Sequence, residues 1–304
     1  MRVFVAGATG VIGRALVPAL LREGHAVTGM TRSPARAAAL ERTGAAAAVC
    51  DALDAGGLVA AVRDARPEVV VHALTDLPGS FRRLARGTGA NNRLRREGTR
   101  NLVAAAARAG ARRVVAESIA FLYAPEGEMV KAEDGRPWTD APRSFVPTVR
   151  ALLELERAVT ETPGVEGVVL RYGWLYGPGT WFARGGLAAR LVRRRLFPRV
   201  GGGLVSWLHV EDAAGAAVRA LSAGVPGIYN VVDDTPVGWG DWLSEYARLL
   251  GAPRPLPVPT GVADRLGGFT LTRQRGATNA RARRELGWQP LYPDWHDGFA
   301  ASLR

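Results

Sequence analysis

The segment VFVAGATGVIGRALVPALL, residues 3–21, joins an apolar strand, a glycine-rich turn and a helix without interruption. Its glycines Gly7, Gly10 and Gly13 are spaced three apart. Glycine at such positions permits a tight turn, lets a phosphate approach the backbone, and lets the helix pack closely on the sheet. The first turn of the helix offers unpaired N–H groups and the positive end of a dipole to an anion. This order of elements predicts a socket for the pyrophosphate of a dinucleotide.

Strands and helices continue to alternate after this first unit. We expect strands at residues 25–32, 46–51, 67–75 and 112–118, and helices at 33–44, 56–65 and 91–109. Alternation of this kind specifies a doubly wound α/β fold, so the predicted fold class is a Rossmann-type doubly wound parallel sheet. Residues 124–145 break the pattern with a loop rich in Gly, Pro and acidic residues, and loops of that length usually form a lid or bind a ligand.

Composition narrows the range of partners. With 304 residues, 47% of them hydrophobic, the chain can bury a large core. No stretch approaches the ~20 apolar residues of a membrane span, and the chain opens directly on a strand, so we expect no membrane contact, no signal peptide and a cytoplasmic location. The net charge of +12 would suit nucleic acid, but arginines are scattered along the chain and Lys131 is the only lysine. We therefore expect a small-molecule substrate and no nucleic acid. A homodimer is the commonest assembly, and no histidine has the spacing of a metal ligand.

Seven motifs follow one another in a fixed order. They are GATGVIG at 7–13, CDALD at 50–54, VVVHALT at 69–75, NNRLRREGTRNL at 91–102, LRYGWLYGPG at 170–179, LHVEDAA at 208–214 and RRELGWQP at 283–290. In this order and spacing the chain resembles the extended short-chain dehydrogenase/reductase family of epimerases, dehydratases and reductases. The resemblance implies a dinucleotide-binding Rossmann domain and a smaller α/β substrate-binding lobe. We expect the first to comprise residues 1–170 plus about 207–232, and the second residues 171–206 and 233–304.

The resemblance also implies a set of cofactor-binding residues. They are Gly7, Thr9, Gly10, Val11, Ile12, Gly13, Thr31, Arg32, Arg36, Asp51, Ala52, Ala73, Leu74, Thr75, Asn92, Arg150 and Leu175.

The second strand bears on the choice between NAD and NADP. Family members that prefer NAD place an acidic residue where this chain has Thr31, and Arg32 and Arg36 can pair with a 2′-phosphate through charge-assisted hydrogen bonds. NADP is the favoured cofactor. NAD is the alternative, for which Arg32 would be a solvated surface residue.

The family's catalytic pair is missing from the expected helix. The resemblance implies a tyrosine whose phenol is made acidic by a lysine four residues later, on the same helical face. Aligning VPTVRALLE, residues 146–154, puts Val146 in the tyrosine position and Arg150 in the lysine position. Valine can carry out no acid/base chemistry. Arg150 can keep the lysine's hydrogen bond to the nicotinamide ribose.

Substitute catalytic residues must therefore come from elsewhere. Ser118 matches the family's Ser/Thr position at the end of strand five, although it could simply end the strand with a backbone hydrogen bond. Tyr123 and Tyr172 are candidate acids, with aromatic packing as the alternative for each. Glu117 would cost several kcal/mol if it were buried unpaired, so it either pairs with an arginine or faces the cleft. Asn92 resembles the asparagine that steadies the family's active-site backbone, with a helix N-cap as the alternative.

These residues support two hypotheses of function. The first is an NADP-dependent oxidoreductase or epimerase-like enzyme that acts on a small organic molecule, such as a secondary metabolite, by hydride transfer, with Ser118 and one of Tyr123, Tyr172 or a water supplying the proton. The second is a cofactor-binding sensor without redox turnover, or a non-redox enzyme on the same scaffold. Aromatic and basic residues expected near the substrate suggest an aromatic or otherwise apolar substrate, with an anionic group as an option. They are Trp181, Phe182, Trp207 and the segment 189–203.

Overall fold

The computed structural model describes residues 1–76, 88–265 and 268–304. Its centre is a sheet of seven parallel strands, whose near-continuous apolar runs suit burial on both faces. The spatial order is β11 (Gly227–Val231), β7 (Glu166–Tyr172), β5 (Arg113–Ile119), β4 (Val69–His72), β1 (Arg2–Ala6), β2 (Ala26–Thr31) and β3 (Ala46–Val49). The strand order reverses between β1 and β4, where α/β sheets of this kind bind ligands. The predicted fold class is confirmed.

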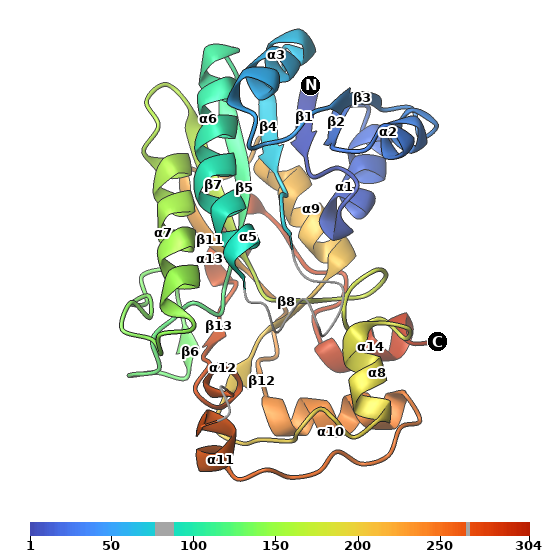
Figure 1. The fold of residues 1–304 in the computed structure, drawn as a ribbon, viewed down its shortest axis with the longest axis vertical. Coiled ribbons are helices and arrows are strands. Elements are labelled where there is room, and N and C mark those ends of the chain that lie inside the picture. The colour runs from blue at the N-terminus through green and yellow to red at the C-terminus, as the bar shows by residue number, and fades with distance from the viewer. Residues whose placement is uncertain (77–87, 266–267) are drawn as a thin grey trace.

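Helices cover both faces of the sheet (Figure 1). One face packs against α1 (Val11–Arg22), α9 (Val210–Ala220) and α13 (Ala280–Leu286), and the other against α3 (Ala55–Ala65), α6 (Thr99–Arg108) and α7 (Val146–Thr160). Helix α2 (Pro34–Glu41) flanks β2 and β3. As the sequence predicts, Ser33 caps α2, because its hydroxyl accepts a hydrogen bond from the Arg36 backbone N–H.

The helix expected at residues 91–109 is built from three pieces. Helix α5 (Gly89–Arg93) leads into a π-helical turn, η1 (Leu94–Gly98), and then into α6. A π-helical turn inserts one residue into the helical ladder, and such turns are frequent at functional sites. This one places Arg95 inside the molecule, with 8% of its surface exposed.

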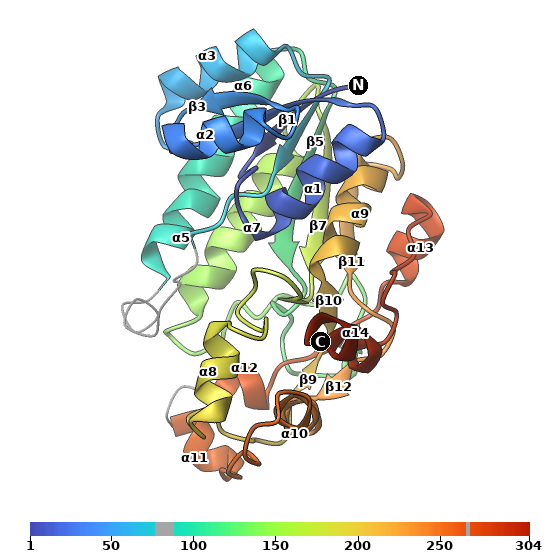
Figure 2. The ribbon, with the colours of Figure 1, turned by 90° about the vertical axis from the view of Figure 1, so that its right-hand side faces the viewer.

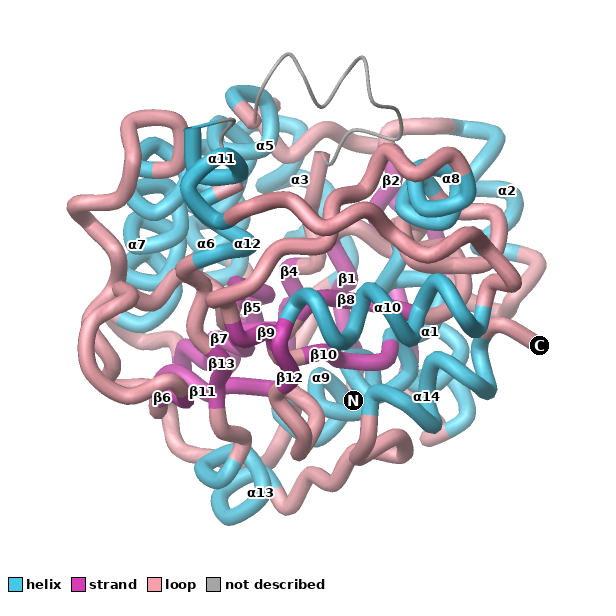
Figure 3. The backbone as a smooth tube through the Cα atoms, turned by 90° about the horizontal axis from the view of Figure 1, so that it is seen from below, coloured by secondary structure: helices cyan, strands magenta, loops and turns pink. Residues whose placement is uncertain are grey.

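A smaller lobe lies below the carboxyl ends of the strands (Figures 1 and 2). Its own core is strongly aromatic, with Phe182, Trp207, Trp239, Trp242 and Phe299 packed together. The lobe contains α8 (Leu187–Arg193), α10 (Trp239–Leu249), α11 (Thr260–Arg265), α12 (Phe269–Thr272) and α14 (Trp295–Ser302), with β9 (Leu204–Val205) paired to β12 (Val237–Gly238). Helices α10 and α14 lie side by side on its lower surface (Figure 3).

Two short parallel pairs connect the lobe to the sheet. They are β8 (Trp174–Tyr176) with β10 (Trp207–His209), and β6 (Val130–Lys131) with β13 (Gly276–Ala277). The second pair anchors the loop at 124–145 to the C-terminal segment. The exact division into two domains stays a prediction, and one part of the C-terminal segment packs differently from expectation: Ala282, Leu286 and Trp288 lie in the sheet core on the α1 and α9 face.

Candidate functional site

The glycine turn forms a close-packed cradle between β1 and α1. Gly7 has φ +92°, and a Cβ atom there would lie 2.1 Å from the carbonyl oxygen of Ala73. A Cβ atom on Gly13 would lie 2.3 Å from the Gly7 oxygen. In the described part of the chain no side chain caps the start of α1 at Gly10, so its first N–H groups point to an open turn. This is the geometry that an anion such as a pyrophosphate requires.

The cradle opens into a pocket of about 370 Å³ at the carboxyl ends of the strands. Eleven of the predicted cofactor-binding residues line it, namely Gly7, Thr9, Gly10, Thr31, Arg32, Arg36, Asp51, Ala52, Ala73, Leu74 and Thr75. Arg32 and Arg36 are exposed at its rim, and Thr31 is buried beside them, with its hydroxyl oxygen 3.5 Å from that of Thr9. The structure thus brings a neutral strand end and two guanidinium groups to one side of the pocket.

Six of the predicted cofactor residues do not line this pocket. They are Val11, Ile12, Gly13, Asn92, Arg150 and Leu175. Ile12 and Leu175 pack in or against the core on the α1 face, and Gly13 is buried within α1. The pocket gains residues that the motif comparison missed: Met30, Ser33, Leu53, Asp76, Ala90, Arg93 and Leu94. Their common signal is position, because they lie near the end of a strand or at one end of a helix.

Ser118 lies in a buried ion-pair network instead of an open cleft. Its hydroxyl donates a hydrogen bond of 2.7 Å to Oε1 of Glu156 on α7. Arg171 holds the same carboxylate in a bidentate pair, with Nε 2.8 Å from Oε1 and Nη2 2.7 Å from Oε2. All three residues are less than 5% exposed. Ser118 is thus occupied in joining β5 to α7, and the expectation that it acts in catalysis receives no support.

Tyr123 belongs to the same network. Its hydroxyl donates to Oδ1 of Asn230 at 2.6 Å and accepts from Nη1 of Arg171 at 2.9 Å. Burial raises the pKa of Tyr123, and Arg171 opposes that rise. With both hydrogen-bonding functions used and 1% of its surface exposed, Tyr123 is not placed to donate a proton to a substrate.

Tyr172 is a core residue. It lies on β7 with 4% of its surface exposed, and its hydroxyl donates to the backbone oxygen of Ala213 on α9 at 3.0 Å. Burial raises its pKa well above the ordinary value. The structure corrects the expectation that Tyr172 stands at the mouth of the cleft and selects the packing alternative.

Arg150, aligned with the family's lysine, does not line the pocket. It is exposed on the outer side of α7, whereas Thr148 and Leu152, also four residues apart, are buried on the inner side of the helix. Thr148 accepts a hydrogen bond of 3.2 Å from the amide of Asn92. The inner face of α7 therefore carries neither tyrosine nor lysine, and the sequence has no lysine on this helix at all.

Asn92 proves to be a buried bridge between helices. It lies inside α5, whose N-cap is Thr88, so the N-cap alternative is wrong. Its amide nitrogen binds the hydroxyls of Thr88 and Thr148, and its Oδ1 accepts from Nη1 of Arg95 at 3.4 Å. Asn92 therefore links α5, η1 and α7.

Glu117 is the acidic group left at the carboxyl end of β5. Residues alternate along a strand, so Ser118 faces α7, while Glu117 shares the α1 and α9 face with Val115. His72 pairs with Ala116, so the next residues along the two strands are Ala73, which lines the pocket, and Glu117. Glu117 is half-buried, and burial raises its pKa to about 7, with Arg95 opposing the rise. In the described chain, no ion pair of 4.0 Å or less reaches it.

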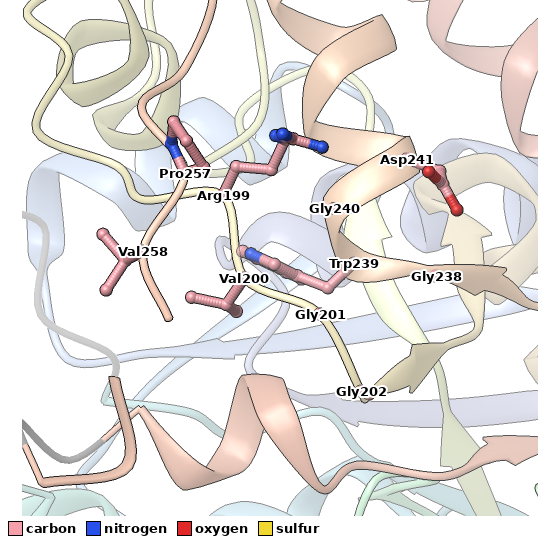
Figure 4. A pocket seen from close by; sticks show the side chains of 11 residues that line it. Arg199, Val200, Gly201, Gly202, Gly238, Trp239, Gly240, Asp241, Pro257 and Val258 are labelled. Atoms are coloured by element: carbon pink, nitrogen blue, oxygen red, sulfur yellow. The ribbon is translucent and has the colours of Figure 1, made fainter. Parts of the chain in front are cut away.

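The smaller lobe has a pocket of its own, of about 270 Å³. Figure 4 shows the side chains of Arg199, Val200 and Trp239 around it, with Asp241 on the first turn of α10. The remaining walls are mostly glycine backbone, from residues 201–203 and from Gly238 and Gly240. Residues 201–203 lie within the segment that the sequence assigned to the substrate region. Nε of Arg199 and Nε1 of Trp239 are buried donors without a hydrogen-bond partner among the residues the structure places.

Two half-buried aromatic residues stand where the sheet meets the lobe. Phe121, which follows β5, and Trp174, on β8, stack with ring centroids 4.5 Å apart and an interplanar angle of 18°. Phe182 and Trp207, expected near the substrate, lie instead in the aromatic core of the lobe. Large aromatic side chains favour burial, so their presence in sequence does not separate core from pocket.

Two structural findings concern membranes and metals. Within residues 1–76, 88–265 and 268–304, no helix combines the length and apolar character needed to cross a membrane. The same residues contain no group of three or more His, Cys, Asp and Glu side chains arranged to hold a metal ion.

Comparison with known proteins identifies relatives along nearly the whole chain. The model of the NAD dependent epimerase/dehydratase family matches residues 3–231. A 3-diazoavenalumate denitrifying reductase from a Streptomyces species is 49% identical over 312 residues, covering 98% of this chain and 99% of the relative.

Solved structures show the same fold at lower sequence identity. UDP-glucose 4-epimerase from Thermotoga maritima, with UDP-glucose, has a TM-score of 0.78 at 20% identity, over 99% of this chain and 97% of that one. The human epimerase family protein SDR39U1, with NADPH, has a TM-score of 0.75 at 22% identity, over 99% of both chains.

Proposed function

The chain belongs to the NAD dependent epimerase/dehydratase family, and from this premise we propose that it is an NADPH-dependent reductase that removes the diazo group from an aromatic carboxylic acid. The observation that carries the proposal is the 49% identity, along almost the whole of both chains, to a reductase named for denitrifying 3-diazoavenalumate. An enzyme acting on a small molecule agrees with the pocket at the carboxyl ends of the strands.

The pocket residues fit a nicotinamide dinucleotide phosphate. The cradle of Gly7 and Gly13 leaves no room for a side chain, which suits a pyrophosphate held against bare backbone. Arg32 and Arg36 stand beside the part of the pocket that would hold the adenosine, and they supply two positive charges that can pair with a 2′-phosphate. A carboxylate at this place would repel the same group. We infer a preference for NADPH over NADH from this arrangement.

The chemistry of the proposed substrate suits the residues of α7. When bound, the reduced nicotinamide would supply a hydride, so that replacement of a diazo group on an aromatic ring follows Ar–N₂⁺ + H⁻ → ArH + N₂. Dinitrogen leaves as a neutral gas and needs no acid to assist its departure. In the family, the tyrosine and lysine exchange a proton with the oxygen of an alcohol or ketone. The diazo group has no such oxygen. Thr148 and Leu152 at the inner face of α7 leave that region without a titrating pair.

The lobe supports an aromatic acid as substrate. The stacked pair of Phe121 and Trp174 offers a flat apolar wall next to the end of β5. The unpartnered donors of Arg199 and Trp239 in the lobe pocket suit an acceptor group such as a carboxylate.

A turnover assay tests the proposal. Purified protein is incubated with NADPH and a set of aromatic diazo acids, while NADPH fluorescence and evolved dinitrogen are followed together. We expect one dinitrogen released for each NADPH oxidised, and no NADPH oxidation with the same acids lacking the diazo group. A broad panel of ketones and enones is run in parallel. Turnover of those compounds alone, without dinitrogen from any diazo acid, would sink the assignment of substrate while keeping a reductase.

A further inference from the structure

We propose that Arg199 and Trp239 bind the carboxylate of the substrate and thereby select an aromatic acid that has a spacer between its ring and its acid group. The inference rests on the proposed function and deepens it. Both side chains line the lobe pocket of about 270 Å³ (Figure 4). Neither the family description nor the names of the relatives assign a role to these two residues.

The two side chains carry hydrogen-bond donors that no described residue accepts. Nε of Arg199 and Nε1 of Trp239 are buried without a partner among the residues that the structure places, and Trp239 is 1% exposed. A guanidinium and an indole N–H can donate but cannot accept. A buried donor without a partner costs free energy, so the pocket favours a ligand that brings only acceptors. An ionised carboxylate is such a ligand, and it also pairs with the positive charge.

The charge of Arg199 is not neutralised by the acidic residue in the same pocket. Asp241 lines the pocket, yet no ion pair of 4.0 Å or less joins it to Arg199 in the described chain. Its carboxylate turns back towards the start of its own helix, where Oδ2 lies 2.9 Å from the place that a Cβ on Gly238 would take. There it faces the positive end of the α10 dipole. The exposed arginines at 193–195 add positive charge to the lobe, which attracts anions.

Backbone contacts fix the segments that carry both donors. The N–H of Arg199 donates to the Leu256 oxygen at 2.9 Å, and the Arg199 oxygen accepts from the N–H of Val258 at 2.9 Å. The N–H of Trp239 donates to the Gly203 oxygen at 3.1 Å. The two donors are therefore held by separate segments that are already in place before a ligand binds, and such preorganisation lowers the cost of binding.

A run of aromatic rings joins this pocket to the end of the sheet. The centroid of Trp239 lies 6.3 Å from that of Trp174, which stacks on Phe121 at 4.5 Å just past β5. A substrate ring placed on Phe121 and Trp174 is thus one indole away from the lobe pocket. A carboxylate bonded directly to that ring stays beside Trp174, whereas a conjugated chain between ring and acid can extend to Arg199.

The first test measures binding without reaction. Calorimetry gives the Kd of the protein with oxidised cofactor, NADP⁺, for cinnamate, for its neutral amide and for benzoate. Wild type should bind cinnamate about tenfold or more tightly than the other two compounds, because the amide lacks the charge and benzoate lacks the spacer. Arg199→Gln should raise the Kd for cinnamate by about 10–100-fold, the equivalent of one or two charge-assisted hydrogen bonds, and leave the Kd for cinnamamide unchanged.

Two further variants separate the donors from general effects of the lobe. Trp239→Phe keeps an aromatic ring and removes the N–H, so it should raise the Kd for cinnamate by about 3–10-fold. Arg254→Gln is the matched control, since Arg254 is exposed in the same lobe and does not line the pocket. Its Kd for cinnamate should equal that of wild type.

The second test is kinetic and uses an aromatic diazo acid. Arg199→Gln should raise KM by the same factor as the Kd for cinnamate and leave kcat within a few-fold of wild type. The reason is that the acid group is bound equally in the ground state and in the transition state.

Two results would overturn the inference. One is an equal wild-type Kd for cinnamate and cinnamamide, which needs no variant and would show that the donors do not recognise an acid. The other is an Arg199→Gln variant, folded by circular dichroism, that keeps the wild-type Kd for cinnamate. Failure of the proposed function looks different, because wild type then releases no dinitrogen while the Kd comparison still decides whether Arg199 binds the carboxylate.

Discussion

Glu156→Ala should destabilise the protein strongly, because it leaves the buried guanidinium group of Arg171 without its ion-pair partner. Arg171 and Glu156 are 3% and 4% exposed at their side chains, and two hydrogen bonds of 2.8 and 2.7 Å join them. Breaking a buried pair by removing one partner costs about 3–5 kcal/mol. With an unfolding entropy of roughly 2.1 cal/mol/K per residue, a single cooperative transition of this chain would lose about 5–8 °C in Tm.

The assay is thermal and urea unfolding followed by circular dichroism. The exposed Glu154→Ala is the control and should lie within about 0.5 kcal/mol of wild type. A double replacement, Glu156→Leu with Arg171→Met, should recover most of the loss, since no charge then remains buried without a partner. Ser118→Ala removes one hydrogen bond to the same carboxylate, so it should cost about 1 kcal/mol while kcat stays near the wild-type value. A loss below 1 kcal/mol for Glu156→Ala, or a collapse of kcat in Ser118→Ala with stability intact, would refute this reading of the network.

Three further predictions concern the cofactor pocket and the sheet. Gly7→Ala should abolish NADPH binding in a fluorescence titration, because the new Cβ would lie 2.1 Å from the Ala73 oxygen. A Kd within a few-fold of the wild-type value would show that the backbone at Gly7 or Ala73 can move to make room for a side chain. Replacing both Arg32 and Arg36 by alanine should raise the Kd for NADPH by about 10–100-fold, the equivalent of one or two charge-assisted hydrogen bonds. The Kd for NADH should stay unchanged. An equal loss of affinity for both cofactors would show that the two arginines do not bind the 2′-phosphate. His72 has a folded pKa of about 4, below its ordinary 6.5, so the unfolded chain binds its proton first and stability falls as pH drops from 6.5 towards 4. Wild type should lose about 3 kcal/mol more than His72→Gln over that range in urea unfolding, and equal losses would contradict the assignment.

The parts of the molecule that could be predicted from the sequence are those set by neighbours in the chain. Gly7 and Gly13 predict the cradle because the φ of +92° at Gly7 and the approach of Gly13 to the Gly7 oxygen are local, although the contact between Gly7 and Ala73 joins distant parts of the chain. Eleven of the predicted cofactor-binding residues line the pocket. The Ser33 cap and the apolar run of β4 are local in the same way.

The surroundings of the predicted catalytic residues could not be foreseen where their partners are distant in sequence. Tyr172 finds its acceptor 41 residues away in Ala213, and Ser118 finds Glu156 38 residues away, so no local pattern separates them from active-site hydroxyls. Arg150, aligned with the family's lysine, is exposed on α7, because the side of this helix that packs on the sheet is set by contacts distant in sequence. For Glu117 the sequence leaves a choice between an arginine partner and the cleft, which stays a prediction, and the alternation of β5 places this residue on the face away from α7.

The central claim is tested most directly by tracing the transferred hydrogen. Wild-type protein is supplied with NADPH that carries deuterium at the hydride position and with an aromatic diazo acid, and the products are analysed by mass spectrometry and NMR. We expect one deuterium on the ring carbon that held the diazo group and one dinitrogen released for each NADPH oxidised. Product without deuterium at that carbon, or NADPH oxidation with both nitrogen atoms retained, would contradict it.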